Sequence, residues 1–511
     1  MIKVIDLFAG PGGLGEGFSS LYKDRSRIFK IKLSIEKDPF AHQTLELRAF
    51  FRWFDRGKAP DDYYKYLSGK ITRSELFNRH QKAARCAQKE AWLAELGKSR
   101  ISERLVDGKI KRAIGSANRW VLIGGPPCQA YSLVGRSRVI GGEGLKQYEA
   151  DPKHKLYRHY LRILAVHQPP VFVMENVKGL LSAKLKKKNT IERILTDLRN
   201  PLRAFPSLRR KAPRRNLEYR LISLTRTDNE LLKKINPEDF VLRAEKYGIP
   251  QARHRVIILG IRTDFDSQPH LMSFEPEVTI EQVIGDLPRL RSGFSKENDS
   301  AKIWKGVIKG IVEARWMKNG SLNKKLRLAI KRAAKHVSSG LNRGQQFIRS
   351  DRVPAIYADW FHDNRLGGVC NHETRGHIRE DMYRYFFSAV YSRIYGRSPL
   401  LEDLPKKLLP EHRNVEEALE DNMFNDRFRV QVKGHPSTTV VSHIAKDGHY
   451  YIHYDPTQCR SLTVREAARL QTFPDNYFFE GPRTEQYKQV GNAVPPLLAL
   501  KIADMVADLL R

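Results

Sequence analysis

Residues 120–128 read Trp-Val-Leu-Ile-Gly-Gly-Pro-Pro-Cys. Four apolar residues followed by Gly-Gly-Pro-Pro predict a buried strand that ends abruptly in a stiff loop. Pro126 and Pro127 fix two φ angles and exclude a helix interior or a central strand. Ligands of open α/β sheets bind at the carboxyl ends of the strands. The stretch therefore predicts that Cys128 presents its thiol at the ligand-binding edge of such a sheet.

A cysteine in a loop has two interpretations. The thiol is a strong nucleophile once its pKa is lowered or a base takes its proton. A free cysteine that follows a strand by chance is the alternative, so the partners elsewhere in the chain decide. The sequence contains only four cysteines, at positions 86, 128, 370 and 459, too scattered for a disulfide framework. A reducing cytoplasm is the expected location.

The chain is large and strongly basic. Its 511 residues favour two domains, and its formal net charge is +34. Such an excess of Lys and Arg predicts a polyanionic partner, most often nucleic acid, although a merely solubilising surface is the alternative. The segment from Met1 to Phe8 reads as a strand and not as a signal peptide, and no long apolar run predicts a membrane anchor.

A glycine-rich turn follows the first predicted strand, Ile2 to Phe8. It reads Ala9-Gly10-Pro11-Gly12-Gly13-Leu14, and such glycines let the backbone approach a ligand closely. By itself the turn is weak evidence. However, the next apolar segment, residues 31–35, ends in Glu36, which is where nucleotide-binding folds hold a ribose hydroxyl. No Lys-Ser or Lys-Thr follows the glycines, so we expect a nucleoside cofactor without a triphosphate.

Further candidates come from later strands. The predicted strand 171–174 ends in Glu175, on the same sheet edge as Cys128, where a carboxylate either acts in chemistry or caps the next helix. Arg253 and Arg255 precede the strand 256–260 on one side of it, and either bind an anion or pair with acids.

Two charged stretches interrupt the predicted sheet. Residues 46–112 are expected to form a helical insertion outside it, in which Asp107 is the only candidate for ligand contact; a solvated turn at Asp107-Gly108 is the alternative. Residues 184–234 form a second, basic insertion that either lies in solvent or contacts phosphates.

The strand and helix alternation is lost between residues 274 and 454. The sequence therefore predicts a catalytic and cofactor-binding domain at 1–273, a second, mixed domain at 274–454, and a segment at 455–511 that returns to the first. In this last segment Thr463 and Glu466 fit a capping box. No metal site is predicted, because Cys370, His372 and His377 lack the paired spacing of a zinc site.

Together these motifs resemble the DNA (cytosine-5)-methyltransferase family of bacterial restriction-modification type. Six motifs carry the resemblance in the family's order, and they span nearly the whole chain. They are Asp6 to Gly13, Gly125 to Gln129, Glu175-Asn176-Val177, Gln251 to Arg255, Arg465 to Gln471, and Gly491 to Pro496. The resemblance implies an α/β fold with a Rossmann-like, S-adenosylmethionine-dependent sheet, helices on both faces, and a target-recognition domain at 274–454.

The resemblance also implies a mechanism. In such enzymes the target cytosine is flipped out of the duplex, because its ring cannot be reached inside the stack. The thiolate of Cys128 adds to carbon 6, Glu175 acts at ring nitrogen 3, and carbon 5 takes the methyl group of S-adenosylmethionine. By the same resemblance Arg255 faces the base carbonyl and Arg253 supports the site. The cofactor residues it implies are Phe8, Ala9, Gly10, Gly12, Gly13, Leu14, Glu36, Asp107, Pro126, Asn492 and Ala493.

The expected partners are duplex DNA, S-adenosylmethionine and a restriction endonuclease acting on the same site, and the enzyme is expected to be a monomer. Two rival functions remain open: the same chemistry on cytosine in RNA, and a catalytically silent DNA-binding protein. The family's acid that contacts the adenine amino group is obscured by the insertion at 46–112, so Asp107 is only a candidate. The target sequence varies too freely within the family to be inferred.

Overall fold

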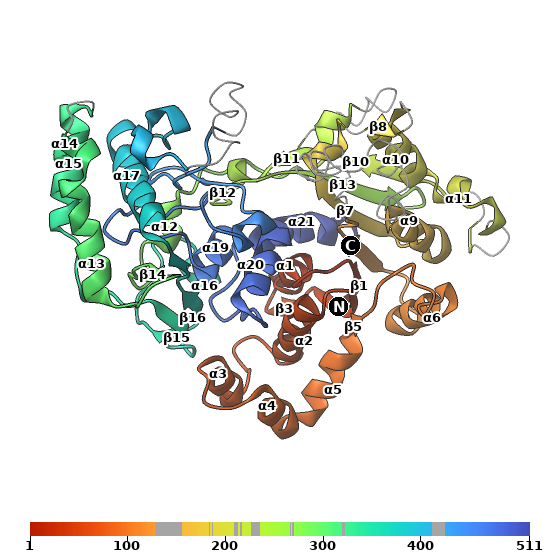
Figure 1. The fold of residues 1–511 in the computed structure, drawn as a ribbon. Helices are drawn as coiled ribbons and strands as arrows, with labels where there is room; N and C mark the ends of the chain where they lie inside the picture. The colour runs from red at the N-terminus through yellow and green to blue at the C-terminus, as the bar shows by residue number, and fades with distance from the viewer. Residues whose placement is uncertain are drawn as a thin grey trace. The chain divides into compact units, whose positions relative to one another are not determined.

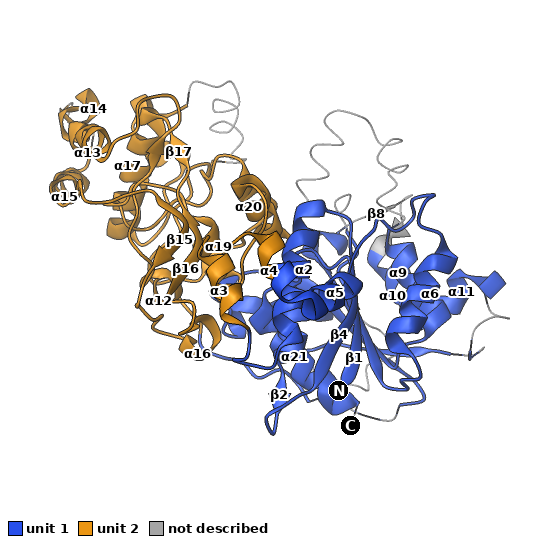
Figure 2. Ribbon diagram, turned by 90° about the horizontal axis from the view of Figure 1, so that it is seen from below, with its two compact units in different colours: residues 1–59, 77–276, 493–511 blue, residues 60–76, 277–492 orange. Residues whose placement is uncertain are grey.

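The computed structural model describes residues 1–127, 156–182, 184–185, 188–208, 213–214, 217–225, 236–265, 267, 270–318, 322–410 and 425–510. The chain folds into two compact units. Unit 1 comprises residues 1–59, 77–276 and 493–511, and unit 2 comprises residues 60–76 and 277–492, as Figure 2 shows in blue and orange. Each unit is described by itself.

Unit 1 is built on a mixed sheet with the strand order β10-β13-β7-β6-β1-β4-β5, and β11 pairs with β13 beside this path. Its strands are β1 (Ile2–Leu7), β4 (Phe29–Glu36), β5 (Ala91–Leu93), β6 (Trp120–Gly124), β7 (Val171–Val177), β10 (Tyr219–Ile222), β11 (Val241–Arg243) and β13 (His254–Arg262). The five strands from β7 to β5 are parallel, whereas β13 is antiparallel to β7 and β10. The predicted α/β sheet is confirmed.

Helices cover both faces of this sheet, as predicted (Figure 1). On one face Ile5 and Leu7 of β1 join a core with α6 (Glu103–Ile114), α9 (Leu156–His167) and α10 (Thr190–Arg199). On the other face α1 (Gly13–Ser19) packs against α21 (Pro496–Leu509). Successive residues of a strand point to opposite faces of the sheet. Because helices cover both faces, every residue from Val4 to Leu7 is buried.

The structure differs from the expected insertions in two places. The segment 46–112 contains β5, which pairs in parallel with β4 and forms an edge of the sheet. It also contains α6, whose Val106 and Ile110 lie in the sheet's core. The segment 184–234 ends in β10, which pairs with β13. Strands this short carry too few residues for a period-2 pattern to stand out.

Unit 2 is smaller and mixed. Its helices are α3 (Asp61–Leu67), α12 (Ile280–Ile284), α13 (Ala301–Gly310), α14 (Arg315–Lys318), α15 (Lys324–Lys335), α16 (Ala358–Phe361), α17 (Arg379–Tyr395), α19 (Val464–Leu470) and α20 (Arg483–Asn492). Its strands β14 (Gly293–Phe294) and β17 (Gly376–His377) pair in parallel, and β15 (Gly344–Arg349) pairs antiparallel with β16 (Gly368–Glu373).

Buried ionic groups hold the end of unit 2 together. The predicted capping box at α19 is present, because Thr463 and Glu466 exchange side-chain and backbone hydrogen bonds. The buried Glu466 carboxylate also accepts from Arg460 at 2.6 and 2.7 Å, so α19 is held at its first turn by a paired charge. Farther on, the stretch Arg483–Leu509 has the length and hydropathy of a membrane span, but 78% of its apolar window is buried, as in the core helices of globular proteins.

Candidate active site

Three strand ends meet at one edge of the unit 1 sheet. Leu7 at the end of β1 pairs with Gly124 of β6, and Gly124 pairs in turn with Met174 of β7. The glycine turn, the Pro126-Pro127 loop and Glu175 therefore begin side by side. This is the carboxyl edge, where open parallel sheets bind their ligands.

The turn between β1 and α1 has the backbone of a close-approach loop. Phe8, Gly10 and Gly12 all have positive φ angles, of 56°, 56° and 101°. A Cβ placed on Gly10 would meet nothing within 4 Å, whereas one on Gly13 would lie 2.1 Å from the carbonyl oxygen of Val494. Gly10 thus leaves open space above the turn, and Gly13 lets the backbone before α21 pack directly on α1.

Helix α1 is fixed in place by a buried ion pair. Glu16, 3% exposed, accepts a hydrogen bond from Nε of Arg48 in α2 (Pro39–Trp53) at 2.9 Å. Arg52 of the same helix lies 3.4 Å from the Glu16 carboxylate and also pairs with Glu90. Removing one partner of a buried ion pair leaves the other charge buried and unpaired, which is unfavourable. The ion pair therefore fixes α1 against α2 and holds the turn before α1 in one geometry.

Glu36 ends β4 and is bound to the glycine turn. Its Oε2 accepts the backbone N–H of Gly10 at 2.7 Å, and its Oε1 accepts those of Lys37 and Asp38, both at 2.8 Å. Burial of the carboxyl group raises the pKa of Glu36, although these hydrogen bonds oppose the shift. The contacts leave further lone pairs on the carboxylate for a hydroxyl donor.

These features fit a nucleoside cofactor. The open space over Gly10 admits a ligand close to the backbone, and the acid expected to hold a ribose hydroxyl lies beside it. Phe8 and Ala9 are partly buried in the same turn, and Leu14 is buried at the start of α1.

Glu175 and Arg255 form an ion pair at the same edge. Nε of Arg255 lies 3.0 Å from Oε1 of Glu175, and the side chains are 12% and 13% exposed. Burial lowers the pKa of Arg255, and the neighbouring Glu175 carboxylate opposes this shift. A Cβ on Gly125 would lie 2.9 Å from Oε2 of Glu175. A side chain at position 125 would therefore displace the Glu175 carboxylate from its present position.

Arg253 is almost fully buried, at 2% exposure. Its Nη2 donates a hydrogen bond of 2.8 Å to the carbonyl oxygen of Ala493, which precedes α21. Arg253 thus connects the start of β13 to the segment whose Val494 lies against Gly13. Arg253 thus contacts backbone, whereas Arg255 pairs with an acid, Glu175.

Asn176 is a positioning residue that the sequence analysis left unassigned. Its Nδ2 donates to the carbonyl oxygen of Pro126 at 3.3 Å, and its Oδ1 accepts the N–H of Val177. Asn176 therefore fastens the Pro-Pro loop to β7. Its position next to Glu175, at the end of a buried strand, is the signal that points to it.

The alternative interpretation of Asp107, a solvated turn at Asp107-Gly108, is wrong, because Asp107 lies within α6. Its two oxygens accept from Nη1 and Nη2 of Arg162 at 3.0 and 2.7 Å, and Nε2 of His167 lies 2.9 Å away. Although burial acts in the opposite direction, these partners lower the pKa of Asp107. The pairing favours a structural role over the predicted adenine contact.

Glu95 lies closer to the predicted cofactor site. It follows β5, whose Leu93 pairs with Glu36, and the N–H of Ala94 donates to the carbonyl oxygen of Glu36. Glu95 is one-third exposed and within 3.6 Å of Lys37. Glu95 was not predicted from the sequence, because the segment that contains β5 was expected to be an insertion outside the sheet.

Two of the expected residues are not placed at this edge by the structure. Cys128 lies outside the described residues, which resume at Leu156. Asn492 belongs to unit 2, and Ala493 to unit 1. Pro126 is buried at the end of β6, two residues before Cys128. The structure thus brings together the glycine turn, Glu36, Pro126, Glu175, Arg253, Arg255 and Ala493.

Comparison with known proteins identifies close relatives. The C-5 cytosine-specific DNA methylase family matches residues 102–201 and 236–507. The type II methyltransferase M.Bpa9945I of Bacillus paralicheniformis is 32% identical over 99% of both chains. The type II methyltransferase M.DdeI of Desulfomicrobium norvegicum is 24% identical over 99% of this chain and 88% of its own. The DNA (cytosine-5-)-methyltransferase M.ApeKI of Aeropyrum pernix is 28% identical over 76% of this chain and 81% of its own.

A solved structure supports the fold. The crystal structure of a putative DNA modification methyltransferase encoded within a prophage of E. coli matches 100% of this chain and 99% of its own, with a TM-score of 0.51 and 17% identity. At this identity the match bears on architecture alone. It agrees with the mixed sheet and its flanking helices.

Proposed function

The chain belongs to the C-5 cytosine-specific DNA methylase family, and from this premise we propose that Cys128, Glu175, Arg253 and Arg255 carry out the reaction on a flipped-out base. The chain is a DNA (cytosine-5-)-methyltransferase with type II relatives over nearly its full length. The observation that supports the residue assignment is the ion pair of Glu175 with Arg255 at the sheet edge where the Cys128 loop begins.

Cys128 is the proposed nucleophile. Its thiolate attacks carbon 6 of cytosine, and the enamine so formed is nucleophilic at carbon 5. After carbon 5 has taken the methyl group, loss of the carbon 5 proton and expulsion of the Cys128 thiolate restore the ring. The two residues ahead of it are prolines, and the carbonyl oxygen of Pro126 is held by Asn176. A stiff, fastened loop reduces the freedom that the thiol loses when it meets the ring.

Glu175 and Arg255 hold the base. Arg255 donates to the ring carbonyl, and the carboxyl group of Glu175 protonates ring nitrogen 3 or donates a hydrogen bond to it, which neutralises the negative charge that develops during attack. In the free enzyme the two form an ion pair, with Nε 3.0 Å from Oε1. An entering cytosine therefore exchanges contacts with two groups that are already oriented. Arg253 positions the pair through its bond to Ala493.

S-adenosylmethionine is the proposed cofactor, and it supplies the methyl group. Glu36 accepts a ribose hydroxyl, and the backbone from Phe8 to Gly13, with Leu14, lines the site beside it. Pro126, Asn492 and Ala493 complete the proposed contacts. Glu95 replaces Asp107 as the proposed partner of the adenine amino group, because it follows the strand that pairs with Glu36.

The proposed substrate is one specific sequence in duplex DNA, read by residues 274–454. The net charge of +34 supports a phosphate-rich partner. We place the enzyme in the cytoplasm as a monomer, in a restriction-modification system whose endonuclease cuts the same unmodified sequence. The type II relatives support this context.

One experiment tests the function. The purified chain is incubated with methyl-labelled S-adenosylmethionine and genomic duplex DNA, and modified cytosines are mapped by bisulfite conversion. The expected result is label at cytosine carbon 5 within one short recurring sequence. Label incorporated into RNA but not into duplex DNA, or no label at all, contradicts the proposal.

A further inference from the structure

Helices α13, α14 and α15 of unit 2 form a strongly basic segment, defined here as the basic arm, residues 301–336. It contains eleven Lys and Arg residues and a single acid, Glu313, which gives a formal net charge of +10. Glu313 is paired with Lys318. The remaining cations of the arm thus have no local acid to neutralise them.

The basic arm is folded and has an apolar inner side. Trp304, Val307 and Ile308 of α13 are buried, as are Leu326 and Ile330 of α15. Both helices contact α17, and Trp316 of α14 packs edge-on against Phe387 of α17 with ring centroids 6.0 Å apart. The arm is therefore an ordered, one-sided surface.

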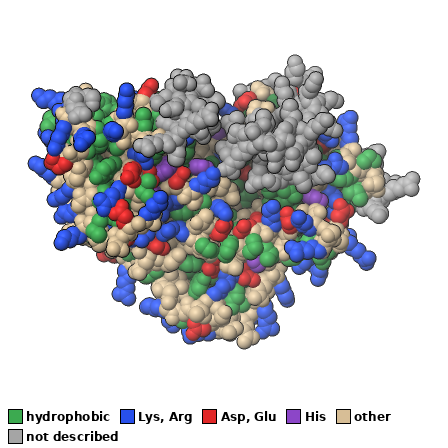
Figure 3. All heavy atoms as spheres, in the orientation of Figure 1, with side chains coloured by type: hydrophobic (Ala, Val, Ile, Leu, Met, Phe, Trp, Pro, Cys, Tyr) green, Lys and Arg blue, Asp and Glu red, His purple; other side chains and the backbone are tan. Residues whose placement is uncertain are grey.

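The outer side of α15 carries its charges in two adjacent stripes. At helical spacing Lys324, Leu328, Lys331 and Lys335 form one stripe, and Lys325, Ala329, Arg332 and His336 form the next. All of the cations in both stripes are exposed. Within the described part of the chain, no carboxylate forms an ion pair with Lys324, Lys325, Arg332 or Lys335. In Figure 3 Lys and Arg side chains gather at the left edge, where Figure 1 places these helices.

This arrangement destabilises the isolated helix. Lys324 and Lys325 occupy the first turn of α15, which contains no acid, so they face the positive end of the helix dipole. Lys331 and Lys335 are like charges one turn apart, a spacing that costs about 0.2–0.5 kcal/mol. In a helix that only faces solvent, these charges bring no stabilisation. A polyanion bound along α15 would relieve both the repulsion between the lysines and the helix dipole and the repulsion between Lys331 and Lys335.

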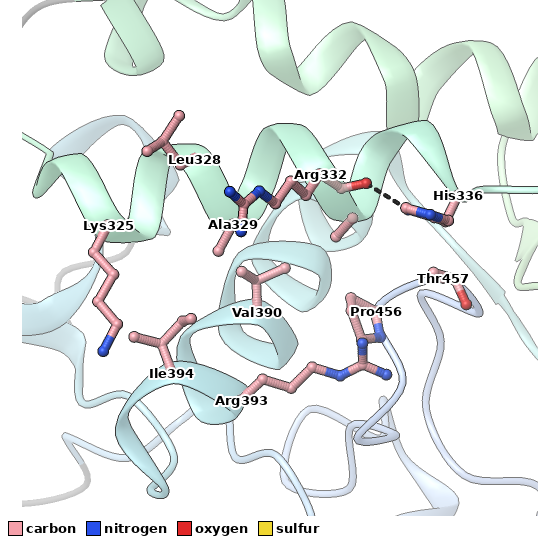
Figure 4. A pocket seen from close by; sticks show the side chains of 11 residues that line it. Lys325, Leu328, Ala329, Arg332, His336, Val390, Arg393, Ile394, Pro456 and Thr457 are labelled. Atoms are coloured by element: carbon pink, nitrogen blue, oxygen red, sulfur yellow. Dashed lines mark hydrogen bonds between the residues drawn. The ribbon is translucent and has the colours of Figure 1, made fainter.

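A pocket of about 390 Å³ lies between the second stripe and α17. Ala329, Val390 and Ile394 form its apolar floor, and the side chains at its rim are Lys325, Arg332, His336 and Arg393, as Figure 4 shows. Arg393 is already paired with Asp455 at 3.0 Å. Lys325 and Arg332 are therefore the rim cations that remain available to an anion.

We infer that the basic arm is a second, sequence-independent DNA contact that binds the phosphodiester backbone outside the methylated sequence. The inference rests on the proposed function for the identity of the polyanion. A phosphate backbone fits because its charges repeat along a line, as do those of the two stripes on α15. Binding there lengthens the duplex that the enzyme holds without adding to the sequence it reads.

The test compares two variants of the basic arm with one control. Lys324→Gln/Lys331→Gln/Lys335→Gln removes the cations of the first stripe, and Lys325→Gln/Arg332→Gln removes the two available cations at the pocket rim. Arg104→Gln/Lys111→Gln/Arg112→Gln is the control. These three residues lie on the exposed side of α6, and α6 and α15 are both 12 residues long. Gln preserves helix propensity, and circular dichroism checks that each variant folds.

Binding to a mixed-sequence duplex is measured over a series of salt concentrations. Each phosphate contact contributes about 0.9 to the slope of log K against log salt. The first-stripe variant is expected to flatten that slope by about 2–3 and the pocket variant by about 1–2, and the control leaves it unchanged. Both arm variants raise KM for DNA, whereas the control leaves KM unchanged.

An unchanged slope in both arm variants overturns the inference, as does an equal fall in the control. Stronger binding of single-stranded RNA than of duplex DNA, lost in the arm variants alone, also overturns it and identifies RNA as the occupant. Methyl transfer by the wild type is measured separately. A wild type that transfers no methyl group contradicts the proposed function, while the salt slopes still decide the inference.

Discussion

Arg255 lies with its Nε 3.0 Å from Oε1 of Glu175, across the antiparallel pair β13 and β7. The pair joins an acid near the carboxyl end of β7 to a cation on β13, the antiparallel neighbour of that strand. Two groups proposed to bind one pyrimidine are therefore held by adjacent strands of a single sheet. Their geometry does not depend on a flexible loop.

Glu175→Gln is expected to lower kcat about 10²- to 10⁴-fold, because Gln keeps the shape but cannot transfer a proton to ring nitrogen 3. The measurement is steady-state transfer of labelled methyl groups to DNA. Glu238→Gln, at an exposed position of unit 1, is the control and retains wild-type activity. A Glu175→Gln enzyme as active as this control contradicts the assignment of Glu175.

Cys128→Ser is expected to abolish methyl transfer and leave DNA binding intact, because the hydroxyl is a far weaker nucleophile than a thiolate of similar size. The matched control is Cys86→Ser in α5 (Gln81–Glu90), an exposed free cysteine. Activity and gel-shift affinity are measured on both variants. Should Cys128→Ser retain full activity, Cys128 is not the nucleophile.

Glu36→Gln is expected to weaken cofactor binding about ten- to a hundredfold, the cost of losing a hydrogen bond to a charged acceptor. Isothermal titration with S-adenosylhomocysteine measures it. Because the pKa of Glu36 is raised by burial, its carboxylate is protonated at a higher pH than that of an ordinary Glu. Wild-type affinity is therefore expected to fall on acidification, and the Gln variant to lack that dependence. A pH-independent wild type would contradict this role.

Gly13→Ala is expected to destabilise the protein by about 1–3 kcal/mol, because its Cβ would lie 2.1 Å from the carbonyl oxygen of Val494. The contrasting variant is Gly108→Ala, inside α6, where a Cβ would meet nothing within 4 Å. This second change is expected to stabilise by about 0.4–1 kcal/mol. Thermal melting compares them, and equal shifts of the same sign count against the packing of residue 494 on α1.

Asp6→Asn is expected to flatten the pH dependence of stability. Burial raises the pKa of Asp6 to about 8; Arg52 opposes the shift, and Glu36 and Glu90 add to it. The folded state therefore keeps a proton that the unfolded state releases near pH 4. This contribution is fully present below about pH 4 and is lost as the pH rises toward 8, by up to about 1.4 kcal/mol per pH unit. Unfolding at pH 5 and 8 measures it, and parallel wild-type and variant curves refute it.

Much of the fold was predictable because strong local patterns decide it. The apolar runs before Gly10, Gly125 and Glu175 are buried strands, and glycines and prolines follow the ends of the first two. Their common edge follows from parallel pairing. Likewise, the capping box of Thr463 and Glu466 is a local signal, and the structure confirms it.

The remainder depends on contacts between residues distant in sequence. Asp107 reads as a free acid until α9 brings Arg162 and His167 to it. Glu95 gains meaning only when three-residue β5 pairs with β4. The contact of Arg253 with Ala493 joins residues 240 positions apart. The roles of Cys128 and of residues 274–454 stay predictions from sequence.

Unit 1 is discontinuous, and this has a consequence for biosynthesis. Its first strand leads the chain, but α21, which packs on α1, belongs to residues 493–511. During synthesis on the ribosome, nearly five hundred further residues are therefore added after the glycine turn before α21, the helix that packs on α1, emerges. Nascent chains should be unable to modify DNA, and an early stop codon that spares every proposed catalytic residue should still yield an inactive polypeptide.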